Sequence, residues 1–310
     1  MRGALQVISR STKPTSLRIP RRRFATSSVS LPTPANKMAP LRIANLGSSF
    51  AAGPSIPPVA DKYARRSGAN FACLVSSRVG AHLTDLTVSG ATLLNLTTDP
   101  QECDGHVFAP QIQNLPTDTD VVLVLGGGND IGYIGGIFED TLNASWLGAL
   151  AMRLSGTGGA PVQASRLDVD GLADRFGGVL DAIHEKAPRA QVLVVEYVAV
   201  LGPDTRPGRD VAFGADRVAH HRAVCEELLQ ATAKAVEGRE KWCHVVSVDK
   251  PSRAHAIGCS KTPWVSGFTW KLFYAGGAYH PRAEGMKAVA EIVYKKMVEL
   301  NIVKDDDGEL

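Results

Sequence analysis

Acidic residues are missing from the start of this 310-residue chain, where the first is Asp61. Basic residues are frequent there, among many Ser and Thr: Arg2, Arg10, Lys13, Arg18, Arg21, Arg22, Arg23 and Lys37. A leader rich in Arg and Ser and free of acid is typical of a mitochondrial transit peptide. We therefore expect residues 1–38 to be a leader and linker, with import into the mitochondrial matrix and cleavage near Phe24. A disordered basic tail has the same composition, and a cytoplasmic product starting at Met38 is the alternative.

Long apolar runs and a strong net charge are also absent. No stretch of eighteen or more apolar residues occurs, so the sequence predicts no transmembrane helix. The formal net charge of +3 is too small to indicate a nucleic-acid partner. The five cysteines never have CxxC spacing, so neither a zinc site nor a redox motif is predicted. Scattered cysteines instead fit a reducing compartment, where they act as small apolar residues.

Five apolar segments have the composition of strands buried on both faces. They are Leu41–Leu46, His82–Val88, Val121–Leu125, Gln191–Leu201 and His244–Val248. The helices expected between and after them cover residues 58–79, Asp168–Lys186, Asp216–Glu237 and Met286–Leu300. Val-rich runs that alternate with helices predict a parallel sheet covered on both sides. We thus predict one domain over residues 39–303, a three-layer α/β/α sandwich of flavodoxin-like type with about five parallel strands, followed by an acidic tail at 304–310.

Four loops with chemically useful residues lie beyond the carboxyl ends of the expected strands, where open parallel sheets bind ligands. Ser49 follows the first strand at the start of an expected helix, whose free N–H groups suit a developing anion. Gly90 follows the second, where a glycine lets its backbone N–H approach a ligand. Asn129 ends a glycine-rich turn after the third and can donate two hydrogen bonds without a charge. His280 stands before Pro281, which suits a first helical turn and so places His280 at a loop end.

Each loop also has an ordinary structural interpretation. Gly47-Ser48-Ser49 could cradle a phosphate or cap a helix. The loop at Gly90 and the turn at Asn129 need no function, and a single histidine is structural more often than catalytic. Among the other histidines, His255 is a weaker candidate, and His220-His221 are expected on a helix, facing solvent or packing at a cap. The order of the four loops therefore matters more than any one of them.

Taken in order, Ser, Gly, Asn and His resemble the four sequence blocks that name the SGNH, or GDSL-like, hydrolase family. Residues 46–53, Leu-Gly-Ser-Ser-Phe-Ala-Ala-Gly, are similar to the family's G-D-S-x-x-x-G block. Residues 127–132, Gly-Gly-Asn-Asp-Ile-Gly, are close to the G-G-N-D-x-G form of its lipase and acylhydrolase members. Ser89–Thr92 looks like the second block and His280-Pro281 like the last. The resemblance spans about residues 41–300.

This resemblance implies a serine esterase or lipase. Ser49 would attack an acyl carbonyl, His280 would accept its proton as general base, and the acyl-enzyme would pass its acyl group to water or another alcohol. The backbone N–H groups of Ser49 and Gly90 and the side chain of Asn129 would form the oxyanion hole, and Asp130 would brace its loop. No metal or organic cofactor is implied, and the partner is a small-molecule or lipid ester.

Two positions depart from the family pattern. Ser48 stands where the family usually has Asp before the nucleophile, and Gly277 stands where Asp usually orients the histidine. No acidic residue occurs from Lys250 through Ala283, so no substitute is near along the chain. We therefore predict a Ser49–His280 dyad whose histidine is held by a backbone carbonyl within Tyr274–Ala278.

Two other classes of protein remain open. A nucleotide-binding flavodoxin-like module would use Gly47-Ser48-Ser49 for phosphate, but it leaves Asn129 and His280 without roles. A catalytically inactive binding protein would explain the missing Asp.

Two segments bear on the ligand. The mostly apolar Ser145–Met152 could cover the site and favour an acyl chain, or be a core helix. The basic stretch 250–283 could attract an anionic ester such as a phospholipid, or be a solvated loop.

Overall fold

A computed structural model describes residues 39–144, 167–259 and 261–305. Three predicted features lie outside the described residues. They are the leader over residues 1–38, the segment Ser145–Met152 and the acidic tail from Asp306 onward.

Five parallel strands form the central sheet in the order β4-β1-β7-β8-β9. Their bounds are β1 Arg42–Gly47, β4 His82–Asp85, β7 Val121–Leu125, β8 Gln191–Val195 and β9 Cys243–Val246. Every neighbouring pair is parallel, with Val122 of β7 opposite Ala44 on one side and Val192 on the other. All residues of β7 are buried, which is why its sequence is a continuous apolar run. The predicted parallel sheet is confirmed.

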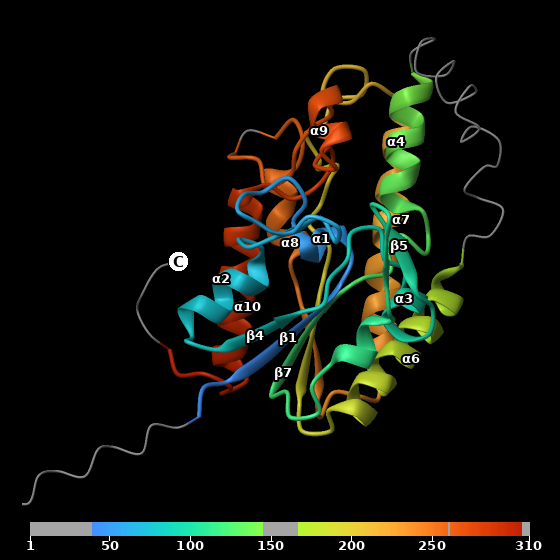
Figure 1. The fold of residues 1–310 in the computed structure, drawn as a ribbon. Helices are drawn as coiled ribbons and strands as arrows, with labels where there is room; N and C mark the ends of the chain where they lie inside the picture. Colours follow the sequence, from blue (N-terminus) through green and yellow to red (C-terminus); the bar gives the residue numbers. More distant parts are fainter. Residues whose placement is uncertain (1–38, 145–166, 260, 306–310) are drawn as a thin grey trace, which may run out of the picture. The chain divides into compact units, whose positions relative to one another are not determined.

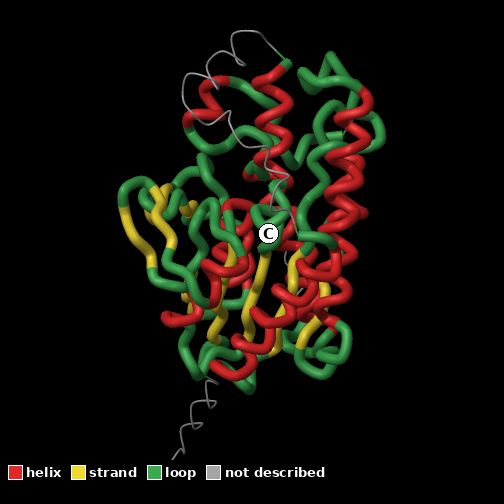
Figure 2. Tube along the Cα trace, turned by 90° about the vertical axis from the view of Figure 1, so that its right-hand side faces the viewer, coloured by secondary structure: helices red, strands yellow, loops and turns green. Residues whose placement is uncertain are grey.

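Helices cover both faces of this sheet, so the predicted three-layer α/β/α sandwich is also confirmed (Figure 1). On one face, α2 (Phe71–Arg78) packs against α10 (Ala283–Glu299). On the other face, α6 (Val169–Lys186) packs against α7 (Ala215–Val236), and α3 (Leu93–Thr97) contacts α6. Figure 2 shows the strands from the side with helices around them.

The predicted strand over Gln191–Leu201 is too long, because β8 ends at Val195. The pairing with β9 ends at Val195, and after it the carboxylate of Glu196 accepts a hydrogen bond from the backbone N–H of Asp249 at 3.2 Å. Val200 is nevertheless fully buried, packed in the core without a strand neighbour. The apolar run here therefore indicates burial of the side chains and not pairing in a strand.

The predicted helix over residues 58–79 is wrong in its first half. A small antiparallel ribbon of β2 (Val59–Asp61) and β3 (Arg66–Ser67) is found there, and α2 begins only after it. The carboxylate of Asp61 accepts the backbone N–H groups of Tyr63 and Ala64 at 2.9 and 3.1 Å, which forms the turn of the ribbon in place of a helix. Asn70 starts the helix, since its side-chain oxygen accepts a backbone N–H at 3.0 Å.

Several short elements lie beyond the carboxyl ends of the strands, where the sequence places the site (Figure 1). They are α1 (Ser49–Ala52), the ribbon of β5 (Gln101–Cys103) and β6 (His106–Phe108), η1 (Gln111–Asn114), α4 (Tyr133–Asn143), α8 (Asp249–Ser252), η3 (Arg253–His255) and α9 (Trp270–Tyr274). In the described part of the chain, no helix is both long and apolar enough to span a membrane.

Candidate active site

Ser49 and His280 are far apart in sequence and hydrogen-bonded in the structure. The Oγ atom of Ser49 is 2.8 Å from Nε2 of His280, and both side chains are buried. Ser49 begins α1 directly beyond β1, and His280 lies just before α10. Phe50 packs its ring against the imidazole, with 5.2 Å between ring centroids. A hydroxyl this close to a neutral imidazole nitrogen has the geometry of an activated nucleophile.

The loop between β1 and α1 is held by two distant polar residues. Gln111 accepts a hydrogen bond from the N–H of Gly47 at 2.8 Å and donates one to its carbonyl at 3.0 Å. Ser48 Oγ lies 3.1 Å from the hydroxyl of Tyr197, which also accepts the N–H of Gly128 at 3.2 Å. Ser48 therefore ties this loop to the glycine-rich turn after β7, although it stands where the resembled family usually has Asp.

Sequence reasoning missed Gln111 and Tyr197, because neither residue belongs to a recognisable motif. Both residues hold the loop between β1 and α1, which approaches the backbone of Leu125 very closely. Gly47 has a φ of 146°, and a Cβ added there would overlap the carbonyl oxygen of Leu125. Only glycine fits at this position.

The second ring nitrogen of His280 contacts a backbone carbonyl, as predicted. Nδ1 lies 2.7 Å from the carbonyl oxygen of Ala278, so a proton on Nδ1 leaves Nε2 free to accept one from Ser49. Within the described residues, no carboxylate is hydrogen-bonded to this ring. The two acids nearest along the chain, Asp249 and Glu284, are each paired with an arginine.

The position of the usual aspartate is occupied by a glycine that packs against Ser55. A Cβ added at Gly277 would lie 2.7 Å from the hydroxyl oxygen of Ser55, so a side chain there would displace that residue. Without a carboxylate, burial dominates the electrostatics of the imidazole. It lowers the pKa of His280 from 6.5 to about 4, opposed by the carbonyl of Ala278. The ring is therefore neutral at physiological pH, which is the state a general base requires.

Tyr279 holds the backbone before His280 in an unusual conformation. Its φ is 60°, in the left-handed region that a bulky residue rarely adopts. The side chain is buried, and its hydroxyl lies 2.6 Å from Oγ1 of Thr141 on α4. Ser266 adds two backbone hydrogen bonds, accepting the N–H of Tyr279 at 3.1 Å and donating to the carbonyl of His280 at 2.9 Å. His280 is thus positioned by a neighbouring segment and a helix.

The donors predicted for an oxyanion hole line the same cavity. It has a volume of about 650 Å³ and borders Ser49, Gly90, Asn129 and His280. Among the described residues, the backbone N–H groups of Ser49 and Gly90 have no acceptor. Asn129 donates one amide N–H to the carbonyl of Ala91 at 2.8 Å, and its second has no acceptor there. All three groups can therefore donate to an anion that forms in the cavity.

Asp130 lies beneath this cavity and has no contact with it. Its buried carboxylate accepts hydrogen bonds from the N–H of Leu93 and from Arg175, both at 3.0 Å. Burial still raises its pKa above the ordinary value. These contacts join the turn after β7 to α3 and α6, which agrees with the bracing role expected from the sequence.

The cavity has one apolar wall and one polar wall. The apolar wall consists of Ile134 and Phe138 from α4 and Phe273 and Tyr274 from α9. Phe138 and Phe273 meet edge to face with 5.4 Å between their centroids, which joins the two helices. The polar wall comes from the residue before β3 and from the β5–β6 ribbon, and it includes Arg65, Glu102 and Asp104. The site can therefore receive a molecule with one apolar and one polar end.

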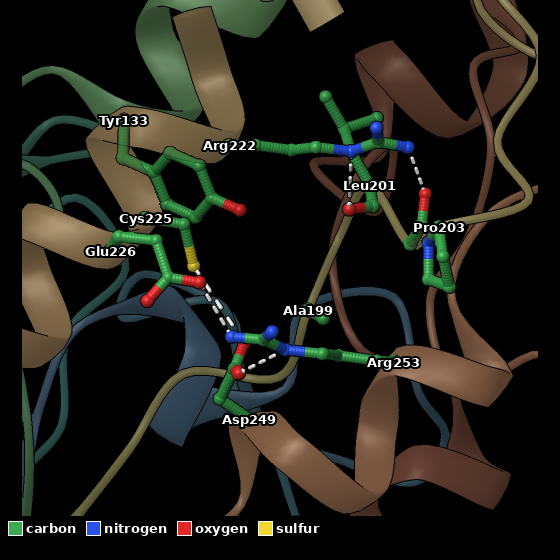
Figure 3. Close-up of a pocket in the computed structure, with 10 residues that line it drawn as sticks. Tyr133, Ala199, Leu201, Pro203, Arg222, Cys225, Glu226, Asp249 and Arg253 are labelled. Carbon is green, nitrogen blue, oxygen red and sulfur yellow. Dashed lines mark hydrogen bonds and ion pairs between the residues drawn. The ribbon is translucent and has the colours of Figure 1, made fainter. Parts of the chain in front are cut away.

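A second cavity, shown in Figure 3, is lined by Tyr133 at the start of α4 together with Cys225, Asp249 and Arg253, and contains none of the predicted site residues. It has a volume of about 300 Å³. Arg253 pairs there with both Asp249 and Glu226, each at 2.6 Å, so the charged groups are largely neutralised by one another. Burial raises the pKa of the Cys225 thiol to about 12, which makes it a poor nucleophile.

The other histidines have structural contacts. His221 lies on a helix as expected, and of the two alternatives it is packed and does not face solvent: it is buried, and its Nε2 lies 2.5 Å from the carboxylate of Asp140. This contact ties α7 to α4. His255 bonds to the carbonyl of Thr262 and stacks on Trp264. The described residues include no group of three His, Cys, Asp or Glu side chains placed to hold a metal ion.

Comparison with known proteins bears on the family and the fold. Residues 46–288 match the model of the GDSL-like lipase/acylhydrolase family. Lipase 2 of Streptomyces coelicolor is 28% identical over 269 residues, covering 83% of this chain and 86% of that protein. The crystal structure of an extracellular lipase from Streptomyces rimosus covers 82% of this chain and 99% of its own, with a TM-score of 0.61 and 22% identity. A phospholipase A1 from Streptomyces albidoflavus gives the same TM-score at 18% identity, covering 83% and 99% of the two chains.

The fold and the match over most of the chain define the class of protein as an α/β/α ester hydrolase. The chain belongs to the GDSL-like lipase/acylhydrolase family. The family and the enzyme class predicted from the sequence are thereby confirmed.

Proposed function

We propose that this enzyme cleaves carboxylic esters through an acyl-enzyme on Ser49. The proton of the Ser49 hydroxyl passes to Nε2 of His280 as Oγ bonds to the acyl carbon. The resulting oxyanion accepts hydrogen bonds from the N–H groups of Ser49 and Gly90 and from Asn129. His280 then gives the proton to the leaving oxygen, and water or another alcohol releases the acyl group by the same steps in reverse. The observation that carries this proposal is the 2.8 Å contact between Ser49 and His280 in a cavity lined by these donors.

Main-chain support of His280 replaces the usual carboxylate in this scheme. The carbonyl of Ala278 fixes the tautomer, because it accepts only from a protonated Nδ1. Loss of the carboxylate from a complete triad costs on the order of 10⁴ in rate when the wrong tautomer results. A carbonyl that enforces the correct tautomer avoids that part of the loss, so a dyad of Ser49 and His280 suffices.

The two walls of the cavity favour a lipid-like ester over a sugar ester. We place the acyl chain along the wall formed by α4 and α9, where Phe138 and Phe273 supply apolar surface. The alcohol end then lies toward the polar wall with Arg65 and Asp104, which pair at 2.6 Å. An ester of an apolar acid with a polar alcohol fits both walls.

Covalent labelling tests the proposed nucleophile. A fluorophosphonate probe, which reacts with activated serine hydroxyls, should label the wild-type chain, and Ser49→Ala should abolish the labelling. His280→Ala should slow it strongly, since the hydroxyl loses its base. Labelling of Ser49→Ala at the wild-type rate would assign the reaction to another serine. An unlabelled but folded wild-type chain would favour an inactive binding protein.

We also propose a destination for the chain from its basic, acid-free start. The leader should direct import into the mitochondrial matrix, with loss of about the first 24 residues. The test is the N-terminal sequence of the protein recovered from fractionated cells. An intact N-terminus in a purely cytosolic fraction would contradict import, and a product starting at Met38 would support the cytoplasmic alternative.

A further inference from the structure

Large apolar side chains are exposed around the mouth of the active-site cavity. Tyr274 and Trp270 on α9 are 77% and 49% exposed, and Val59 and Tyr63 in and after β2 are 67% and 43% exposed. No residue of α9 is buried. Such side chains cost free energy in water and commonly mark a surface that binds a partner.

Contacts show that these side chains belong to one region. Val59, Lys62 and Tyr274 line a shallow cavity of about 300 Å³, which shares Arg65, Asp104 and Tyr274 with the active-site cavity. Trp270 packs against Tyr274, with 6.1 Å between ring centroids. The two cavities are therefore neighbours, and the apolar residues border them. We call this region the mouth surface, defined by Val59, Lys62, Tyr63, Trp270, Lys271 and Tyr274.

The charges of the mouth surface are positive. Lys62 and Lys271 are exposed, and neither forms an ion pair within the described residues. Lys62 instead lies over the ring of Tyr63, 4.6 Å from its centroid. Of the neighbouring acids, Asp104 pairs with Arg65, whereas Glu102 on the polar wall of the active-site cavity has no ion pair among the described residues. The mouth surface itself, as defined by its six residues, presents apolar rings together with two lysines and no acid.

This combination matches the surface of an anionic lipid layer. Tyr and Trp have an apolar body and a polar edge, which suits the boundary between acyl chains and headgroups. Lysine keeps its ammonium at the headgroups while its stem lies along apolar surface. A protein partner would not require both aromatic rings and lysines next to a cavity with an apolar wall.

We propose that the mouth surface docks the enzyme on anionic phospholipid membranes. Docking places the apolar wall of the cavity next to the lipid, so that an ester enters without crossing water. The benefit to catalysis rests on the proposed function, but the docking itself does not require Ser49. The two ideas can therefore fail separately.

Vesicle sedimentation tests the docking directly. The full chain carrying Ser49→Ala is mixed with vesicles of phosphatidylcholine alone or with about 30% phosphatidylserine, and the bound fraction is measured. We expect binding to the anionic vesicles that weakens as salt rises, because added ions screen the lysines. Trp270→Ala with Lys271→Glu should lower the partition coefficient about tenfold or more, since both attractions are removed.

A second variant protects against local unfolding of α9. Lys62→Glu with Tyr63→Ser changes the other side of the mouth surface and should also lower partition about tenfold. The matched control is Lys241→Glu, an exposed lysine just before β9 and so at the opposite edge of the sheet. This variant changes the net charge away from the mouth surface, so its partition coefficient should stay within about twofold of that of the parent. All variants should keep the melting temperature of the parent.

Three results would overturn the proposal. The first is no binding to anionic vesicles by the folded parent. The second is equal loss of binding in Lys241→Glu, which would show attraction by net charge alone. The third is a dimer in analytical ultracentrifugation that Trp270→Ala with Lys271→Glu dissociates, which would assign the surface to a second copy of the chain.

Discussion

The loops that carry Ser49 and His280 reach the same cavity by different means. Ser49 directly follows a central strand, and Gly47 allows that strand to turn sharply against β7. His280 follows no strand, and its place depends on backbone contacts to Ser266 and on the hydroxyl of Tyr279. The nucleophile is thus located by the end of a strand, with Gln111 and Tyr197 holding its loop, whereas the base is located by contacts to another loop and to α4. The first loop should therefore tolerate loss of its hydroxyl, and the second should be sensitive to its supports.

The largest expected effect is that of Ser49→Ala. Without the hydroxyl no acyl-enzyme can form, so kcat should fall by at least about 10⁴. The fold should be unchanged, because a strand end and Gln111 hold the loop without the hydroxyl. Hydrolysis of a short-chain nitrophenyl ester and the melting temperature are the measurements. Turnover by the purified variant at the wild-type rate would show that Ser49 is not the nucleophile.

Asn129→Ala should have the next largest effect. The amide donates to an oxyanion that exists mainly in the transition state, so kcat should fall about 10²–10³-fold with little change in KM. Steady-state kinetics on the same ester separate the two constants. A change in KM alone would instead make Asn129 a substrate-binding residue.

Tyr279→Phe tests the side-chain support of the base loop. It removes the contact with Thr141, which should lower stability by about 1 kcal/mol. The kcat should fall about three- to tenfold as His280 becomes less well placed. Thr141→Val is the matched partner, and the double variant should lose less than the sum of the two. Additive effects in chemical denaturation and in kcat would mean that the two residues act independently.

The smallest effect is expected from mild acid. Because burial lowers the pKa of His280 to about 4, Nε2 stays unprotonated as pH falls through the usual histidine range. The kcat/KM should therefore change less than about twofold between pH 8 and pH 5, and fall only as pH approaches 4. A pH series with a neutral ester measures it. An acid limb centred near 6.5 would show that His280 titrates normally and lacks this burial effect.

The sequence by itself determined the layers of the fold and the positions of four chemical residues. Val121–Leu125 reads as a central strand because both of its faces are buried. Ser49, Gly90 and Asn129 could be found because they follow strands, and parallel strands bring their carboxyl ends to one edge. His280 could be found from its helix-starting proline. Their arrangement around one cavity was predictable for this reason, while their catalytic roles stay predictions.

Where the local sequence pattern was ambiguous or absent, only the tertiary structure decided the local fold and the contacts of the site. The apolar run after Val195 is buried without pairing, and residues 58–79 contain a ribbon whose turn is held by the carboxylate of Asp61. Tyr197 and Thr141 support the site through contacts with residues far along the chain. A hydrogen bond between distant residues leaves no periodic pattern in a single sequence, because it depends on how packed elements meet. The carbonyl that holds His280 is the intermediate case. The missing acid predicted a main-chain partner within Tyr274–Ala278, and only the packed structure decided that it is the carbonyl of Ala278.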